Sequence, residues 1–298
     1  MNMTRTLFSI AACAALGGCG SSEEPAAAVT SAPTPSTTAP ERPLETPAPA
    51  PAAAGAQAVP IFEQTLAYGE GRRSNLVGYL AMPQDAAEPL PGIIVIHEGW
   101  GLNDDIKALT RRLAGEGYVA LAVDLYGGRT AATPDAAEAL LSEVYADPDA
   151  ARRNLQQAYD YLEKYAFAPR IATIGWDLGG EWSLQTALQY PGALDAAVMY
   201  YGRGVFTDRD RLAPLNVPLL GFYGGDDKSI PVRQVQEFRA RLLELGKNAE
   251  VLIVQHVDHS FANPSSATYN AQAANEAWAT TLAFLERHLK LATPTRPQ

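Results

Sequence analysis

Hydrophobic positions follow two alternating patterns along most of the chain. Short apolar runs such as 92–96 (GIIVI) and 171–176 (IATIGW) are typical of strands buried on both faces of a parallel sheet. Between such runs, apolar residues recur every three or four positions, as in 104–117, and this spacing predicts helices with one buried face. Strands that alternate with helices predict a mostly parallel sheet flanked by helices.

The expected elements run from residue 62 to residue 290. The first two strands alternate apolar and polar residues and predict an antiparallel pair. The expected strands cover 62–69, 76–83, 92–100, 118–128, 170–176, 194–202, 217–227 and 249–257. The expected helices cover 103–118, 134–166 as two helices divided near Asp147 and Pro148, 178–190, 232–246 and 267–290.

The start of the chain has the pattern of an export signal. Arg5 precedes an apolar stretch, 7–16, that is too short to span a bilayer as a helix. The run Leu16-Gly17-Gly18-Cys19 resembles a bacterial lipobox. We therefore expect a lipid on Cys19 that anchors the protein to a membrane of the cell envelope, in the periplasm. An ordinary signal peptide cleaved nearby is the alternative.

Composition divides the chain into four parts. Residues 1–18 form the expected signal peptide. Residues 19–58 are rich in Ala, Pro and Thr and have few large apolar side chains, so they predict a disordered tether. Residues 59–291 have a globular composition and a length that suits one α/β domain. Residues 292–298 are expected to be a flexible tail.

Charge and cysteine content narrow the possible functions. The formal net charge of −10 argues against nucleic acid as a partner. The chain has only two cysteines, Cys13 and Cys19, and both lie in the export segment. The folded part therefore has no disulfide and no thiol nucleophile. We expect a monomer that acts on a small molecule without a cofactor.

Polar residues with catalytic potential follow four of the expected strands. In open α/β sheets, ligands bind beyond the carboxyl ends of the strands. Glu98, Asp177, Asp227 and His259 all lie at such ends. The segment 174–184 (IGWDLGGEWSL) reads as a strand, a tight glycine turn and a helix, and Asp177 is at the apex. An aspartate next to glycine is usually a turn former, but four polar strand ends in one chain favour a catalytic site.

These residues also carry a family resemblance. The stretches HEGWGLN, DLYGG, GWDLGG, GGDDKSIP and DHSFANP resemble the dienelactone hydrolase family over about residues 60 to 290. The resemblance implies an α/β-hydrolase fold without a cap domain. It also implies hydrolysis of a small ester or lactone, as by a carboxymethylenebutenolidase.

The resemblance implies a role for each strand-end residue. The family has a Cys nucleophile at the elbow apex, where this chain has Asp177. Asp227 would be the triad acid, His259 the base, and Glu98 the residue that contacts the apex. The order of nucleophile, acid and base along the chain is that of α/β-hydrolases. Asp226 is an alternative acid, but the family register favours Asp227.

The resemblance also implies the surroundings of the site. The amides of Gly99 and Leu178 would stabilise an oxyanion. Arg129 lies near an arginine that binds the substrate carboxylate in the family, and Asn263 stands where a second such arginine is found. The loss of that second arginine argues against a small dianionic dienelactone as the substrate. The expected pocket residues are completed by Trp100, Trp176, His97 and Tyr126.

An aspartate at the apex leaves several chemistries open. A carboxylate attacks a carbonyl poorly, but it can attack saturated carbon, as in dehalogenases and epoxide hydrolases. Those enzymes carry a large cap, and the loop before residue 217 is too short for one. If Glu98 faces Asp177, one of the two carboxyls would hold a proton, and the pair could activate water. A non-catalytic protein that binds small molecules, or a cysteine hydrolase altered at its nucleophile, is a further alternative. No spacing of residues indicates a metal site.

Overall fold

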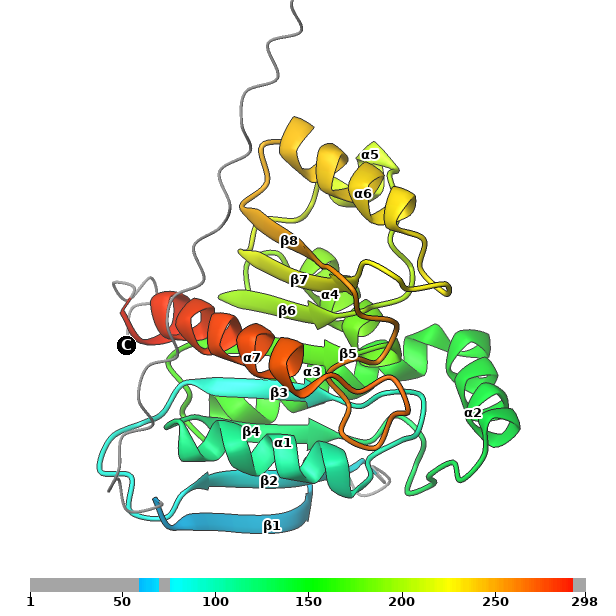
Figure 1. The fold of residues 1–298 in the computed structure, drawn as a ribbon. Helices are drawn as coiled ribbons and strands as arrows, with labels where there is room; N and C mark the ends of the chain where they lie inside the picture. Colours follow the sequence, from blue (N-terminus) through cyan, green and yellow to red (C-terminus); the bar gives the residue numbers. More distant parts are fainter. Residues whose placement is uncertain (1–58, 70–75, 292–298) are drawn as a thin grey trace, which may run out of the picture. The chain divides into compact units, whose positions relative to one another are not determined.

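The structure, a computed structural model, describes residues 59–69 and 76–291. The expected signal peptide, Cys19, the tether and the C-terminal tail lie outside the described residues. The expected α/β alternation is present throughout the described part (Figure 1). The strands are β1 Ile61–Ala67, β2 Val77–Pro83, β3 Gly92–Ile96, β4 Val119–Val123, β5 Ile171–Trp176, β6 Ala196–Tyr200, β7 Leu219–Gly224 and β8 Ala249–Val254.

The expected helices are present in order, and the structure adds the short helix α5, which was not expected. They are α1 Asp104–Gly115, α2 Pro134–Ala146, α3 Pro148–Lys164, α4 Leu178–Gln189, α5 Arg209–Leu212, α6 Val232–Glu244 and α7 Ala271–Leu285, which continues as the π-helix η1 Glu286–Lys290. The final helix begins at Ala271 rather than at 267, because the side chain of Asn270 caps it by accepting from the Ala273 amide. Strand β8 ends at Val254 rather than at 257, since Gln255 and His256 form a turn.

One sheet of eight strands organises the fold. Its order is β1-β2-β4-β3-β5-β6-β7-β8. The pairs β1–β2 and β2–β4 are antiparallel, and all pairs from β4 to β8 are parallel. The fold class is therefore α/β with a mostly parallel sheet, as the sequence predicts. The segment between β6 and β7 holds only the four-residue helix α5, so no cap is inserted there.

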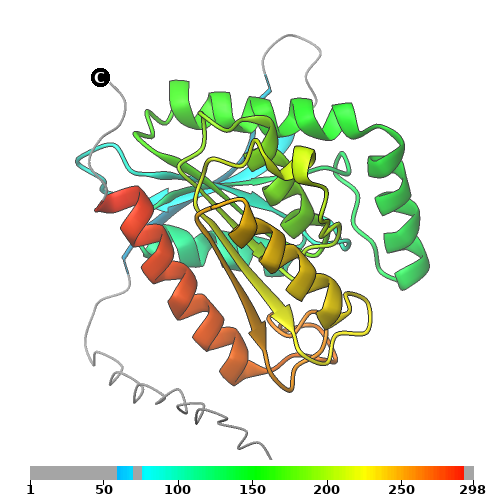
Figure 2. The ribbon, with the colours of Figure 1, turned by 90° about the horizontal axis from the view of Figure 1, so that it is seen from above.

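Helices cover both faces of this sheet, and each face has its own core. Helices α1 and α7 pack on one face, while α2, α3, α4 and α6 pack on the other (Figures 1 and 2). Successive side chains of a strand point to opposite faces, so Ile94 and Ile96 join one core and Ile93 and Val95 the other. This double burial explains why the central strands read as continuous apolar runs.

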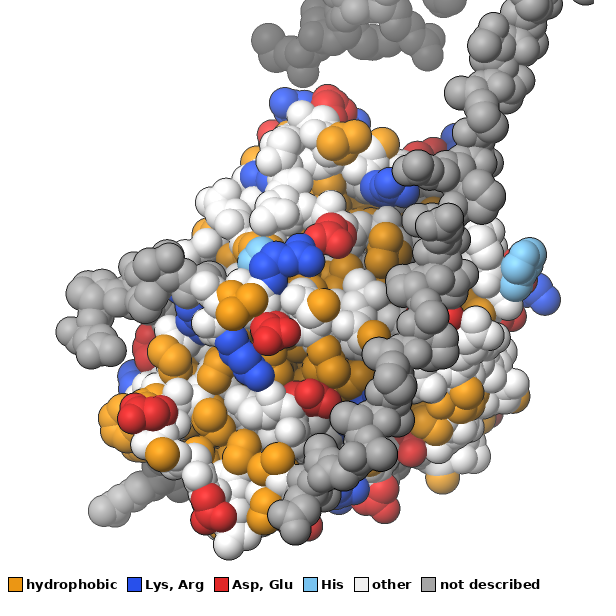
Figure 3. Space-filling view, turned by 60° about the vertical axis from the view of Figure 1, so that its left-hand side comes forward, with side chains coloured by type: hydrophobic (Ala, Val, Ile, Leu, Met, Phe, Trp, Pro, Cys, Tyr) orange, Lys and Arg blue, Asp and Glu red, His pale blue; other side chains and the backbone are white. Residues whose placement is uncertain are grey.

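The described surface is mixed in character. Figure 3 shows one face on which acidic, basic and hydrophobic side chains are interspersed. Scattered apolar side chains of this kind are ordinary on a folded domain. Within residues 59–69 and 76–291, no helix combines the length and the apolar character that crossing a membrane requires.

Candidate active site

Asp177 occupies a strained turn between β5 and α4. Its backbone has φ 50° and ψ −110°, a conformation that costs a non-glycine residue energy. Flanking glycines permit the turn: a Cβ on Gly179 would lie 2.2 Å from the Ile96 carbonyl oxygen, and one on Gly175 would lie 2.1 Å from the Gly179 oxygen. The Asp177 amide donates to the Tyr200 carbonyl at 3.0 Å. The predicted strand–turn–helix elbow is therefore present, with Asp177 at its apex.

Asp227 holds the candidate base. It follows β7, and its Oδ1 accepts from the amides of Ser229 at 2.7 Å and Ile230 at 2.9 Å. Its Oδ2 lies 2.8 Å from His259 Nδ1. Burial opposes ionisation of Asp227, but the hydrogen bonds from His259 and from the two amides outweigh it and lower the pKa of this carboxyl. Asp226 is exposed, so Asp227 is the acid that contacts the base.

His259 lies between two carboxylates. Its Nε2 is 3.3 Å from Asp177 Oδ1, on the side opposite Asp227. Burial lowers the pKa of His259, but the hydrogen bonds and charges of Asp177 and Asp227 more than offset this and raise the pKa to about 9. At neutral pH the ring is therefore an imidazolium that donates one N–H to each carboxylate. In this state His259 is a proton donor, whereas the family resemblance implies a base.

Arg203 is a partner of Asp177 that the sequence reading missed. It lies just beyond β6, and its Nε donates to Asp177 Oδ1 at 2.6 Å. Burial raises the pKa of Asp177, but His259 and Arg203 outweigh burial and lower it. The apex carboxyl is therefore ionised. The sequence shows only that Arg203 follows an apolar run as closely as the other strand-end candidates do; it does not show that its side chain turns toward Asp177.

Glu98, rather than Asp177, is the carboxyl whose pKa is raised. Its side chain is buried, and both oxygens accept from neutral donors: Oε1 from the Tyr201 hydroxyl at 2.9 Å and Oε2 from Asn263 Nδ2 at 2.7 Å. Burial raises the pKa of Glu98, and the negative charge of Asp177 adds to this, so that the pKa reaches about 7. At neutral pH Glu98 is therefore about half protonated while Asp177 is ionised, and burial contributes more to this difference than the like charge does.

Two expected pocket residues belong to the interior instead. His97 is fully buried: its Nε2 accepts from the Leu125 amide at 3.1 Å, and its Nδ1 lies 2.6 Å from the Glu98 carbonyl oxygen. Trp176 is buried in the core and stacks on Tyr200 with 5.4 Å between the ring centroids. Neither side chain can contact a substrate, and both assignments are corrected. Trp176 is the neighbour of Asp177 in sequence, but its side chain lies on the opposite face of the sheet.

The remaining expected residues surround the site in different ways. The Tyr126 hydroxyl donates to the Gly99 carbonyl at 3.2 Å and so supports the loop after β3. Arg129 forms a double hydrogen bond with Glu143, at 3.0 Å and 2.6 Å, and does not join the cluster around Asp177. Asn263 positions Glu98, and both Asn263 and Trp100 line a cavity beside the cluster.

The two residues whose amides are expected to stabilise an oxyanion, Gly99 and Leu178, both lie next to the apex. Leu178 is the first residue of α4, a position whose N–H has no partner within the helix. Gly99 lies against the apex, since a Cβ built on it would be 3.4 Å from Asp177 Oδ2. The apex carboxylate therefore directs Oδ1 to Arg203 and His259, and Oδ2 toward Gly99.

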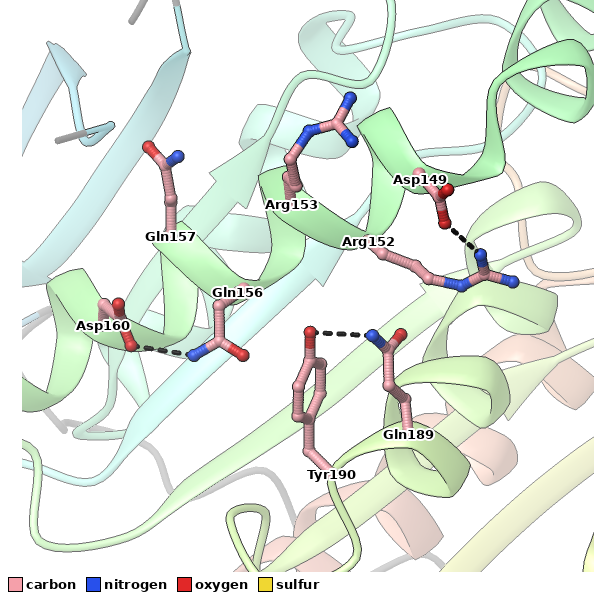
Figure 4. Close-up of a pocket in the computed structure, with 8 residues that line it drawn as sticks. All are labelled: Asp149, Arg152, Arg153, Gln156, Gln157, Asp160, Gln189 and Tyr190. Carbon is pink, nitrogen blue, oxygen red and sulfur yellow. Dashed lines mark hydrogen bonds and ion pairs between the residues drawn. The ribbon is translucent and has the colours of Figure 1, made fainter. Parts of the chain in front are cut away.

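A separate hollow lies away from these residues, between α3 and the end of α4 (Figure 4). Its polar side chains bind one another: Arg152 pairs with Asp149, Gln156 donates to Asp160, and Gln189 donates to the Tyr190 hydroxyl. It contains none of the strand-end residues. In the described part of the chain, no group of three or more His, Cys, Asp or Glu side chains is arranged to hold a metal ion.

Known proteins resemble this chain in sequence and in fold. The model of the "Dienelactone hydrolase family" matches residues 76–289. "Protein usf" of Aquifex pyrophilus is 30% identical over 219 residues, covering 71% of this chain and 93% of that protein. A "Putative carboxymethylenebutenolidase" of Escherichia coli (strain K12) is 30% identical over 243 residues, covering 72% and 83%. The crystal structure of "Putative Dienelactone Hydrolase" from Klebsiella pneumoniae is 30% identical, covers 76% of this chain and 99% of its own, and superposes with a TM-score of 0.69.

Proposed function

Because the chain belongs to the dienelactone hydrolase family, a family of α/β-hydrolases, we propose that it hydrolyses small esters or lactones and that Asp177 activates the attacking water. One observation carries this proposal: the apex carboxylate is ionised and shares its Oδ1 between Arg203 and His259. A residue held in this way is equipped to accept a proton and to pass it on.

Water, rather than the carboxylate itself, is the suitable nucleophile for a carbonyl substrate. Attack by Asp177 on an acyl carbon would form an anhydride, which is less stable than the ester it came from. The oxygen that remains for a substrate or water is Oδ2, which lies beside Gly99. A water bound to Oδ2 would thus stand next to the amides of Gly99 and Leu178, which would stabilise the oxyanion formed by its attack.

The proton transfers then balance over one cycle. Water gives a proton to Asp177 as its oxygen bonds to the carbonyl carbon. The imidazolium of His259 gives its Nε2 proton to the departing alkoxide, and the carbon–oxygen bond breaks. The proton on Asp177 passes to His259, its hydrogen-bond partner at 3.3 Å, and restores the starting state. Asp227 orients the ring and stabilises its positive charge throughout.

The test measures kcat/KM on a neutral aryl ester and on a simple lactone. Asp177→Asn and Asp227→Asn should each lower kcat/KM by about 100-fold or more, as loss of positioned acid–base groups does. The matched control is Asp226→Asn, which removes an exposed carboxylate next in sequence to Asp227. In the wild type, kcat/KM should fall as the pH rises through about 9, because His259 then loses the proton it donates. The proposal would be refuted if the wild type hydrolysed neither compound, or if Asp177→Asn left kcat/KM unchanged.

A second chemistry has one observation in its favour. An ionised Asp177 could displace a leaving group from saturated carbon and form an alkyl ester. Against it, the segment between β6 and β7 carries no cap. Haloalkanes and epoxides therefore belong in the same assay, and faster turnover of either would favour this route. If the protein binds these compounds but does not convert them, the non-catalytic alternative is favoured.

We further propose that the protein is exported and carries a lipid on Cys19. The support is the sequence of the first 19 residues, with its apolar stretch and its Leu-Gly-Gly-Cys run.

A further inference from the structure

A cavity of about 420 Å³ lies beside the catalytic cluster. Its wall includes Trp100, which follows Gly99, and Ser260, which follows His259. A smaller recess lined by Glu98 shares Asn103, Asp105 and Asn263 with this cavity. The cavity therefore lies next to the catalytic cluster, on the side of Gly99 and His259.

The wall of this cavity offers hydroxyl, amide and carboxylate groups and no cation. Besides Trp100 and Ser260, it contains Asn103, Asp105, Ser265 and Ser266, and none of its lining residues is Lys or Arg. Two described arginines near the site are already paired, Arg203 with Asp177 and Arg129 with Glu143. Among the described residues that line the cavity, an anionic group would therefore meet no positive charge.

Asp105 is the residue that gives the cavity its charge. It lies in the first turn of α1, where the helix N-terminus stabilises a carboxylate. Among the described residues, no hydrogen bond or ion pair joins its side chain to another group, whereas its neighbour Asp104 pairs with Lys107 at 3.4 Å. The Asp105 carboxylate is therefore an acceptor that the fold does not use, at the rim of the cavity.

The polar groups around Asp105 include both donors and acceptors, as hydrogen bonding to substrate hydroxyl groups requires. The Oδ1 of Asn103 caps α1 at 3.1 Å from the Ile106 amide, which leaves its Nδ2 as a donor. The hydroxyls of Ser260 and Ser265 can donate or accept. A substrate hydroxyl can donate to Asp105 and accept from Asn103, whereas a substrate carboxylate only accepts and would be repelled by Asp105. Trp100 adds a flat apolar surface against which a small ring can lie.

We infer that the substrate is an uncharged ester or lactone bearing hydroxyl groups, and that Asp105 selects against anionic substrates. This inference rests on the proposed hydrolytic function. It assigns the cavity to the part of the substrate next to the scissile carbonyl. Selectivity arises both from hydroxyl binding and from repulsion of the wrong charge.

Two lactones that differ at one carbon test the inference. Galactono-1,4-lactone carries a neutral hydroxymethyl group where galactaro-1,4-lactone carries a carboxylate. The wild-type chain should have a kcat/KM at least about tenfold higher for the neutral lactone, and added salt should reduce the ratio by screening. Asp105→Asn should bring the ratio to within about threefold of one by raising activity on the anionic lactone. The control Asp104→Asn removes a neighbouring, exposed acid and should leave the ratio unchanged.

Equal rates on both lactones, a preference for the anionic one, or an unchanged ratio in Asp105→Asn would each overturn the inference. Calorimetric binding of the same two lactones to Asp177→Asn separates it from the proposed function. Tighter binding of the neutral lactone, lost in Asp105→Asn, would support the inference even if the wild type hydrolysed neither lactone. Absence of hydrolysis would then count against the proposed function alone. Equal binding of both lactones would refute the cavity assignment directly.

Discussion

At the scale of single residues, the pairing of Asp177 with Arg203 decides how the elbow is to be understood. A carboxylate buried without a cation would take up a proton or destabilise the turn that holds it. Here Arg203 lies 2.6 Å from it and His259 is protonated on its other side. The site is therefore adapted to a negative charge at the apex, which a disabled cysteine site would not require.

Replacing Arg203 tests that adaptation. Arg203→Gln removes a positive charge from Asp177, so the pKa of this carboxyl should rise. The acid limb of kcat/KM, where Asp177 must be ionised, should then move to higher pH by about one unit. Arg152→Gln, which removes an arginine paired with Asp149 on α3, is the matched control and should leave the limb in place. An acid limb that stays fixed in Arg203→Gln would show that Arg203 does not tune the apex.

Sequence reasoning at this scale was partly successful. It predicted Asp177, Asp227, His259 and Glu98, because a polar residue at the end of a buried strand is visible in one dimension. It missed Arg203, because the sequence does not show toward which neighbour a long side chain turns. It misplaced Trp176, because proximity in sequence to Asp177 says nothing about the face of the sheet on which a side chain lies.

At the scale of elements, the elbow depends on the close approach of α4 to the sheet. Gly179, in the first turn of α4, lies against the carbonyl of Ile96 at the end of β3. That contact sets the distance between Asp177 and the loop that carries Glu98 and Gly99. The elements themselves were predictable, since the apolar runs and the glycine turns fix their order. The ends of the elements were harder to predict. Helix α7 starts at its Asn270 cap, and β8 ends just before His256, which adopts φ 59°.

A methyl group at Gly179 should disrupt this contact. Gly179→Ala places a Cβ 2.2 Å from a backbone oxygen that cannot turn away, so the free energy of unfolding should fall by about 2 kcal/mol or more. Gly115→Ala is the control: it lies at the end of α1 with no atom within 4 Å of the new Cβ, and should be neutral or stabilising by up to about 1 kcal/mol. Urea unfolding measures both, and similar values for the two variants would contradict the proposed packing.

At the scale of the whole molecule, the sheet order gathers the site from distant parts of the sequence. Parallel strands β3, β5, β6, β7 and β8 end at the same edge, and each is followed by one residue of the cluster: Glu98, Asp177, Arg203, Asp227 and His259. The alternating pattern was sufficient to predict this edge. The part of the chain before residue 59 is argued from sequence alone.

The proposed lipid anchor on Cys19 can be tested in cells of a bacterium that processes lipoproteins. The full-length protein should fractionate with membranes, and Cys19→Ser should release it to the soluble fraction, because the thiol that accepts the lipid is gone. Cys13→Ser removes a cysteine within the apolar stretch and should leave fractionation unchanged. Recovery of the wild-type protein in the soluble fraction would refute the lipid anchor.

The most direct test of the central claim, that Asp177 activates water and does not attack the substrate, is a single turnover in water labelled with oxygen-18. The protein, in molar excess over a lactone that it hydrolyses, is quenched after one turnover, and the peptide that contains Asp177 is weighed. We predict that the label enters the carboxylic acid product and that the Asp177 peptide keeps its unlabelled mass. Label in the Asp177 carboxyl would require an ester intermediate on that residue and would contradict the account.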